Sequence, residues 1–299
     1  NLRLWQIIPL KKSIVFFLTI LLPLVTFCGE GEIVTNGPIT TRFVTESNID
    51  QISKTIEIGW WIKRDRGWHT YWESPGDVGV PPNLEWELPS GVSFREMLFA
   101  PPQLVKMFQV FAHGHREETL FICRFDVSRQ LVTGENLFFK AKASWLTCYK
   151  TCVPAFADLE ILIPVESEPQ RDNKWNPLFE KFRAEHPVEA PKSWLLESEA
   201  KLSKPPGSKK EYVTMRFPYP DVSKLPTFRF FAQGRYVLSN IFQVPQIYQD
   251  KQGNKFLDIS MELSYWRDSE KKYLEGLLFR SDGWSQTSSK FYKVKLPLR

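Results

Sequence analysis

The clearest pattern along the chain is a series of short runs in which apolar and polar residues alternate. Alternation with a period of two places the apolar side chains on one face of a β-strand. In the first half, the runs that predict strands are Thr55–Ile62, Leu84–Leu88, Thr119–Val127, Leu137–Ser144 and Asp158–Ile163. Clusters of Pro, Gly, Asn and Asp separate these runs, above all Ser74–Pro82 and Leu88–Gly91. Short strands without long intervening helices predict an antiparallel β-sandwich.

The pattern changes after Val165. The spacing of apolar residues in Asn176–His186 predicts a short helix, because Pro177 lies at its start and Pro187 follows its end. A second strand-rich block then begins near Ser193, with expected strands at Tyr212–Phe217, Thr227–Phe231, Phe256–Tyr265, Leu274–Phe279 and Phe291–Leu296. We therefore expect an all-β protein of two sandwich domains, 33–165 and 193–299, joined by a helical linker over 166–192.

The first 32 residues predict export. Lys11 and Lys12 precede a 15-residue apolar run, Ser13–Phe27, which Pro23 interrupts. Such a run is short for a membrane span and typical of a signal peptide. Cys28 stands where a lipid-modified first residue would stand, although Phe27 is bulkier than the residue that a lipoprotein peptidase normally requires there. Lipidation of Cys28, cleavage nearby and an uncleaved anchor are the three alternatives, and membrane association is expected only through this end of the chain.

Composition narrows the class of protein. Hydrophobic residues make up 42% of the 299 residues and aromatic residues 14%, which is ample for packed cores and excludes a disordered chain. The net charge of +5 is mild and spread along the sequence. No basic run is interleaved with aromatic residues, so we do not expect nucleic-acid binding.

The candidate chemistry lies in the paired cysteines Cys148 and Cys152. In an extended strand their Cα atoms would be about 13 Å apart, whereas a disulfide needs about 4.4–6.8 Å. A tight turn through Tyr149–Thr151, or one turn of helix, would bring them within that range. A third cysteine, Cys123, shares one strand face with Phe121 and Phe125, which predicts a buried, inert thiol.

Several motifs resemble one protein family. The run Gly67–Pro82, with Trp86 and the Pro89–Gly91 turn, resembles the exported N-terminal domain of DsbD-type thiol:disulfide interchange proteins. The run Trp145–Pro154 is similar to the paired-cysteine motif of the branch found in ScsB suppressor-of-copper-sensitivity proteins. More loosely, Phe230–Gly234, Val244–Gln246 and Leu274–Leu278 resemble the second immunoglobulin-like domain of that branch.

The resemblance implies immunoglobulin-like folds and a Cys148/Cys152 pair that relays electrons to exported, disulfide-containing proteins, with no cofactor. Family members usually continue into a membrane domain and a thioredoxin-like domain, and the sequence contains neither. The expected electron donor is therefore a separate membrane-embedded thiol protein of the DsbD or CcdA type, and the expected location is the periplasm. Aromatic residues of these motifs are candidates for a cap or a pocket wall around the cysteines: Trp68, Tyr71, Trp72, Phe108, Phe111, Trp145 and Tyr149.

Thiol exchange needs one sulfur that is exposed and partly deprotonated, and the Lys150 ammonium could favour a thiolate. The sequence leaves open which cysteine attacks. Two other classes of function also fit the residues. His113 and His115 together with the two cysteines would form a Zn²⁺ or copper ligand set, although surface histidines beside Gly114 are an alternative. In an adaptor protein, the disulfide would be a permanent structural link.

Overall fold

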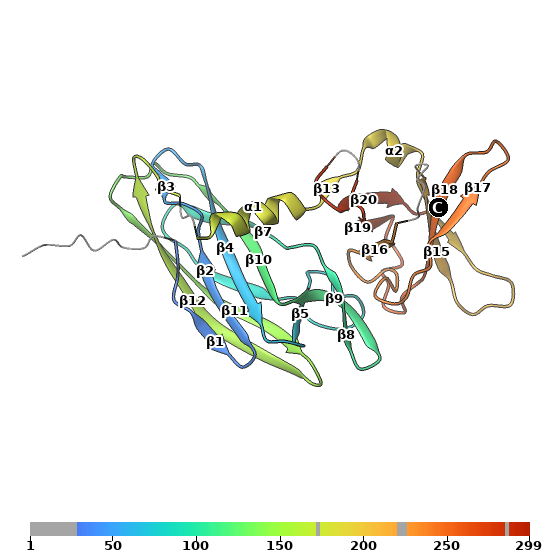
Figure 1. Cartoon of the computed structure of the whole chain (residues 1–299), viewed down its shortest axis with the longest axis horizontal. Helices are drawn as coiled ribbons and strands as arrows, with labels where there is room; N and C mark the ends of the chain where they lie inside the picture. Colours follow the sequence, from blue (N-terminus) through green and yellow to red (C-terminus); the bar gives the residue numbers. More distant parts are fainter. Residues whose placement is uncertain (1–28, 172–173, 220–225, 285–286) are drawn as a thin grey trace, which may run out of the picture.

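The computed structural model describes residues 29–171, 174–219, 226–284 and 287–299. It is built almost entirely of β-strands, arranged in two regions (Figure 1). We call the part built from β1–β12 the first region and the part built from β13–β20 the second region. The signal segment up to and including Cys28 lies outside the described residues.

Two sheets form the first region. One has the strand order β1-β2-β4-β10-β7, and the other has the order β3-β12-β11-β5-β9-β8, with β6 also paired to β11. The strands are β1 Val34–Asn36, β2 Ile39–Val44, β3 Ile49–Asp50, β4 Thr55–Arg64, β5 His69–Tyr71, β6 Asn83–Glu87, β7 Val92–Leu98, β8 Gln103–Met107, β9 Val110–Arg116, β10 Glu118–Val127, β11 Asn136–Cys148 and β12 Cys152–Glu166. All pairs are antiparallel except β3 with β12.

The two sheets pack face to face around one core, as the alternating pattern predicts. Trp60 and Phe121 of the first sheet meet Trp145 and Phe139 of the second, and all four side chains are buried. Cys123 lies in the same core, and burial raises the pKa of its thiol, so the prediction of an inert cysteine is confirmed.

The predicted helix is present as α1, Asn176–Glu185, and it covers the outer face of the first sheet. Phe179 and Phe182 of α1 pack against apolar residues of β4 and β10. Gly59 of β4 makes this approach possible, because a Cβ atom there would lie 2.8 Å from the Phe179 ring. The outward face of a sandwich strand is thus buried beneath the linker.

The second region repeats the arrangement with two four-stranded sheets, β13-β20-β19-β16 and β14-β15-β18-β17. Its elements are β13 Val188–Glu189, α2 Lys192–Leu196, β14 Glu199–Ser203, β15 Tyr212–Pro218, β16 Phe228–Ala232, β17 Gln246–Gln249, β18 Lys255–Glu262, β19 Tyr273–Arg280 and β20 Phe291–Pro297. Both sheets contribute to a common core that includes Met215, Ile259, Phe230 and Leu278.

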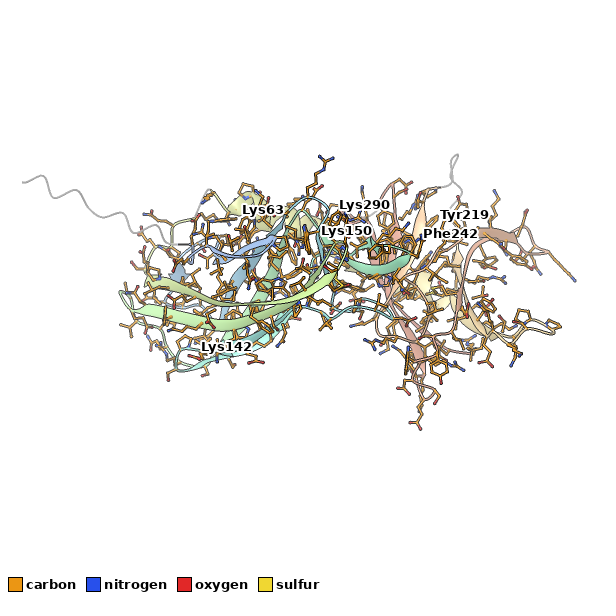
Figure 2. The ribbon with its side chains drawn as sticks, turned by 90° about the horizontal axis from the view of Figure 1, so that it is seen from below. Lys63, Lys142, Lys150, Tyr219, Phe242 and Lys290 are labelled. Carbon is orange, nitrogen blue, oxygen red and sulfur yellow. A yellow bond between two sulfur atoms is a disulfide. The ribbon has the colours of Figure 1, made fainter. Side chains whose placement is uncertain are left out.

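The two regions meet through an apolar cluster. Trp72, which follows β5, is 2% exposed and packs with Phe231, Leu277 and Phe291 of the second region. The position of Trp72 before the Pro75–Asp77 turn also predicts an architectural role from the sequence. Its burial supports that role, although it packs at this junction and not inside the first sandwich. In Figure 1 the loops of the second region lie beside β5, β8 and β9. Figure 2 shows the same molecule from below, with Lys150 at the tip of the β11–β12 hairpin facing the viewer.

Candidate functional site

The two cysteines form a disulfide at the tip of the longest hairpin. The β11 and β12 strands pair without interruption from Asn136 and Pro164 to Cys148 and Cys152. The Cα atoms of the last pair are 4.2 Å apart, slightly closer than the range expected from the sequence, and a disulfide joins their side chains. Antiparallel residues directly opposite each other bring their Cβ atoms close enough for such a bond. Of the two geometries open to the sequence, the structure adopts the tight turn, in which the Tyr149 N–H donates to the Thr151 carbonyl at 3.2 Å.

The two sulfur-bearing residues differ sharply in exposure. Cys148 is 0% exposed and packs against Tyr71, Val105 and Ala112. Cys152, at the start of β12, is exposed. A thiolate from another molecule can therefore approach Cys152 more easily than Cys148.

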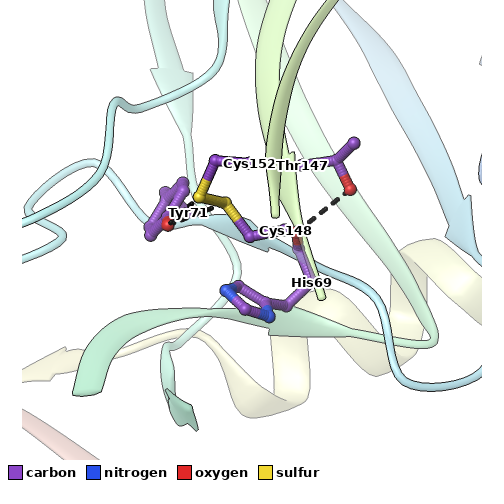
Figure 3. The surroundings of a disulfide bond; sticks show 5 residues. All are labelled: His69, Tyr71, Thr147, Cys148 and Cys152. Atoms are coloured by element: carbon purple, nitrogen blue, oxygen red, sulfur yellow. Dashed lines mark hydrogen bonds between the residues drawn. A yellow bond between two sulfur atoms is a disulfide. The ribbon is translucent and has the colours of Figure 1, made fainter. Parts of the chain in front are cut away.

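Tyr71 supplies the polar contact to both sulfur atoms (Figure 3). Its hydroxyl lies 3.1 Å from the Cys148 Sγ and 3.6 Å from the Cys152 Sγ. A disulfide sulfur carries no hydrogen, so the phenol is the donor. Burial raises the pKa of Tyr71, and the phenol therefore remains protonated at neutral pH.

Backbone pairing fixes the position of Tyr71. Strand β5 lies between β11 and β9, with His69 opposite Cys148 and Tyr71 opposite Gly114. The loop that follows β5 returns over the Tyr71 ring at Gly79, where φ is +98° and a Cβ atom would lie 2.3 Å from the ring. Any larger residue at Gly79 would push Tyr71 away from the sulfur atoms.

His69 is a site residue that the sequence reasoning did not identify. Its ring lies 5.6 Å from the Tyr71 ring, edge to face, and Figure 3 shows it next to Cys148. Burial is the main cause that lowers its pKa to about 4, so the imidazole is neutral at pH 7. The signal in the sequence was the His-x-Tyr spacing, which places both rings on one face of a strand.

The other predicted aromatic residues lie in different places. Trp68 and Tyr149 pack together at the hairpin tip, with ring centroids 5.9 Å apart, and the Lys150 ammonium lies 5.9 Å from the Tyr149 ring. Trp145 is buried in the core beside Trp60. Two of the seven candidates therefore line the tip, Tyr71 contacts the sulfurs directly, and Trp145 packs inside the sandwich.

Phe108 and Phe111 lie in the β8–β9 hairpin, which packs on the disulfide. The hairpin places Val105 and Ala112 against Cys148, whereas Phe108 in its turn is 68% exposed. The Phe111 carbonyl accepts a hydrogen bond from the Asn240 side chain of the second region at 2.8 Å. A capping role for either phenylalanine stays a prediction.

The histidine–cysteine metal set is not assembled. Within the described residues, which include all four candidates, no group of three or more His, Cys, Asp or Glu could hold a metal ion. His113 and His115 are buried and not on the surface, contrary to the alternative raised from the sequence. His113 Nδ1 lies 2.9 Å from the Ser74 carbonyl, and His115 Nε2 lies 2.9 Å from the Ala100 carbonyl. Burial lowers the pKa of His113 to about 4 and that of His115 to about 3.

Asp77 also differs from its expected role. We expect from the sequence that its carboxylate closes a turn on backbone amides. Instead, its Oδ1 accepts a hydrogen bond from the Ser264 hydroxyl of the second region at 2.9 Å. The residue therefore contributes to the junction, and sequence spacing could not have revealed a partner so distant along the chain.

Comparison with known proteins supports the resemblance. The family model described as "Thiol:disulfide interchange protein DsbD, N-terminal" matches residues 40–164, which hold the disulfide hairpin, β5 and the β8–β9 hairpin. This segment is a DsbD N-terminal-type domain. The predicted resemblance to DsbD is thereby confirmed for the first region. No curated protein matches the chain.

A solved structure extends the likeness in fold to the second region. The crystal structure of the N-terminal periplasmic domain of ScsB from Proteus mirabilis superposes with a TM-score of 0.61 at 14% sequence identity. The match covers 90% of this chain and 99% of the ScsB domain. The DsbD-type segment and the region after it therefore share the fold of that periplasmic domain. Among the described residues, no helix is long and apolar enough to cross a membrane.

Proposed function

We propose that this chain is an exported thiol–disulfide exchange protein that relays electrons through Cys148 and Cys152. The observation that carries the proposal is the asymmetry of the disulfide, with Cys152 exposed and Cys148 buried beneath the Tyr71 hydroxyl. Exchange requires one accessible sulfur and a stabilised leaving thiolate, and the exposure of Cys152 and the Tyr71 hydrogen bond to Cys148 support these two roles. The match of residues 40–164 to the DsbD N-terminal family supports the same function.

In the first half of the cycle, a donor thiolate attacks the Cys152 Sγ. The bond between Cys152 and Cys148 breaks as a mixed disulfide forms, and Cys148 leaves as a thiolate. The Tyr71 hydroxyl, 3.1 Å from the Cys148 sulfur, donates a hydrogen bond to the negative charge. The second thiol of the donor then attacks the mixed disulfide, so that Cys152 is released, the donor is oxidised and two electrons remain on this chain.

In the second half, the Cys152 thiolate attacks the disulfide of an exported substrate protein. Cys148 then attacks the resulting mixed disulfide, which restores the bond between Cys148 and Cys152 and releases the reduced substrate. The Lys150 ammonium in the turn between the cysteines favours the Cys152 thiolate electrostatically. Two electrons and two protons pass to the substrate in each cycle.

The finer assignments belong to the same proposal. The donor is a membrane-embedded thiol protein, the substrates are exported disulfide-containing proteins, and the compartment is the periplasm. The apolar run before Cys28 supports export, as does the likeness in fold to a periplasmic domain. The two sandwiches are immunoglobulin-like domains with bounds 33–165 and 193–299, joined by the linker 166–192.

The reduction potential of the disulfide tests the proposal against a permanent structural link. Equilibration with defined thiol buffers should give a potential within the range of exchange proteins, about −120 to −270 mV. Mass spectrometry should show a gain of about two daltons on mild reduction, confined to the peptide that holds both cysteines. A potential below about −300 mV would identify a structural disulfide and favour the adaptor function. Cys123 is an internal control, because its buried thiol should stay unmodified in the folded protein.

A further inference from the structure

The second region exposes large aromatic side chains in two loops near the junction. Phe242 is 82% exposed, Tyr265 is 86% exposed and Trp266 is 68% exposed. Exposed apolar clusters of this kind are typical of surfaces that bind other proteins. The sandwich fold of the second region does not account for these side chains, because its core is formed by other residues.

Hydrogen bonds across the junction hold both loops against the walls of the disulfide site. The Asn240 Nδ2 donates to the Phe111 carbonyl at 2.8 Å, two residues before Phe242. The Ser264 Oγ donates to the Asp77 carboxylate at 2.9 Å, immediately before Tyr265 and Trp266. The loops are therefore positioned by the same hairpin and loop that enclose Tyr71.

Both anchors lie close along the chain to residues that contact Tyr71, whose hydroxyl contacts the sulfur atoms. Phe111 lies three residues before Gly114, the backbone partner of Tyr71, which is about 10 Å along an extended strand. Asp77 lies two residues before Gly79, which packs on the Tyr71 ring. In the view of Figure 2, Lys150 at the hairpin tip and Phe242 flank the junction between the two regions.

The first region adds exposed apolar side chains around Cys152. They come from the hairpin tip, from the start of β12, from the β8–β9 turn and from the loop after β5, and they are Tyr149, Val153, Phe108 and Val80. We call this set, together with Phe242, Tyr265 and Trp266, the two-region surface.

We propose that the two-region surface is a docking site for a folded protein that carries a reactive dithiol, and that the second region supplies part of the recognition. The inference rests on the proposed exchange function and names how the partner is recognised. Any partner must place its sulfur in bonding contact with Cys152, so it must cover the residues around that position. A standard protein interface buries about 800 Å² on each side, equivalent to a disc of about 16 Å radius, so a partner bonded to Cys152 covers residues well beyond the hairpin tip.

A small thiol reacts at Cys152 without touching the second region, and this difference provides the test. The oxidised protein is mixed either with reduced thioredoxin, a folded protein dithiol, or with dithiothreitol, a small dithiol. In both reactions the reagent is oxidised to its disulfide while Cys148 and Cys152 become thiols. Samples are quenched with an alkylating reagent, and mass spectrometry gives the fraction reduced at each time.

The variants are Phe242→Ser and Trp266→Ser, and the matched control is Leu196→Ser. Leu196 is 87% exposed in the same region, but it ends α2, which lies on the opposite side of that region from the disulfide site in Figure 1. We expect each of the two variants to slow reduction by thioredoxin about fivefold or more, as at interface positions that dominate binding. Reduction by dithiothreitol should stay at the wild-type rate, and Leu196→Ser should match wild type with both reagents.

Three results would overturn the docking surface. In the first, thioredoxin reduces both variants at the wild-type rate. In the second, reduction of the variants by dithiothreitol slows as much as reduction by thioredoxin. In the third, thioredoxin reduces the wild-type protein no faster than dithiothreitol does at the same dithiol concentration. A wild-type protein that sediments as a dimer, with a Phe242→Ser variant that sediments as a monomer, would also overturn the proposal and assign the surface to a second copy of the chain. These failures are distinct from failure of the exchange function, which the reduction potential of the wild-type disulfide reports independently.

Discussion

Replacing Tyr71 with phenylalanine removes one hydroxyl group from beneath the disulfide and leaves the ring in its buried place. In the reduced protein, that hydroxyl is expected to donate to the thiolate of Cys148, whose sulfur lies 3.1 Å away. A hydrogen bond to a charged group contributes about 1.5–3 kcal/mol. Since one pKa unit corresponds to about 1.4 kcal/mol, the pKa of the Cys148 thiol should rise by about 1–2 units in the variant.

The thiolate absorbs in the ultraviolet, so titration of the reduced protein with pH measures this shift directly. A higher pKa makes Cys148 a poorer leaving group, and reduction of the disulfide by dithiothreitol should slow accordingly. Tyr149→Phe is the matched control, because it also removes one phenol hydroxyl at the hairpin tip, from a ring that packs on Trp68. Identical thiol pKa values in wild type and Tyr71→Phe would refute a role for the hydroxyl in stabilising the thiolate.

Three further outcomes follow from the structure. Cys148→Ser should accumulate a mixed disulfide through the exposed Cys152, seen as a reductant-sensitive band on gels, whereas trapping only by Cys152→Ser would reverse the assigned roles. Trp72→Ala should lower the free energy of unfolding by about 3–5 kcal/mol in thermal or denaturant melts, because it empties a buried site at the junction; an unchanged midpoint would contradict that packing. Burial holds the pKa of His115 at about 3, below the unfolded value of about 6.5, so the unfolded chain binds more protons between these values. Stability should therefore fall as pH drops below 6.5, by at most about 1.4 kcal/mol per pH unit for this group, and a folded His115→Gln variant should show a shallower slope in melts across that range.

Strands β11 and β12 were predictable because one face of each is buried and the other is exposed, so their apolar and polar residues alternate. Strands β4 and β10 alternate only in part, because α1 also buries their outer face, but the predicted segments still lie within or close to the observed strands. Strand β9 was not among the predicted strands, because its buried run Ala112–His115 contains two histidines and a glycine in place of apolar residues. The His115 ring packs on Phe121 of β10 and the His113 ring packs on Phe231 of the second region, while Ala112 on the opposite face packs on Cys148. Both faces of β9 are therefore buried, and no alternation marks the strand.

The candidate site was predictable only in part. The spacing of Cys148 and Cys152 allowed a disulfide through a tight turn or one turn of helix, and the family resemblance together with that spacing predicted the bond that the structure contains. The contact between Tyr71 and the sulfurs depends on the register of β5 against β11, two strands that lie 77 residues apart at this contact. A local sequence pattern carries no information about the register between distant strands. For the same reason, the hydrogen bond between Asp77 and Ser264 could not be predicted from the sequence.

Because the disulfide lies at the end of the β11–β12 ladder, the backbone pairing of the hairpin does not depend on the oxidation state of the two cysteines. Every residue of β11 from Asn136 to Thr147 has its own backbone partner in β12, and none of these pairs depends on the sulfur–sulfur bond. We therefore expect the hairpin to persist when the bond opens in the proposed exchange cycle. The oxidised and reduced proteins are then expected to have almost the same shape. A partner that binds only one of the two oxidation states must therefore distinguish them through contacts with the sulfur atoms and not through a change in the shape of the chain.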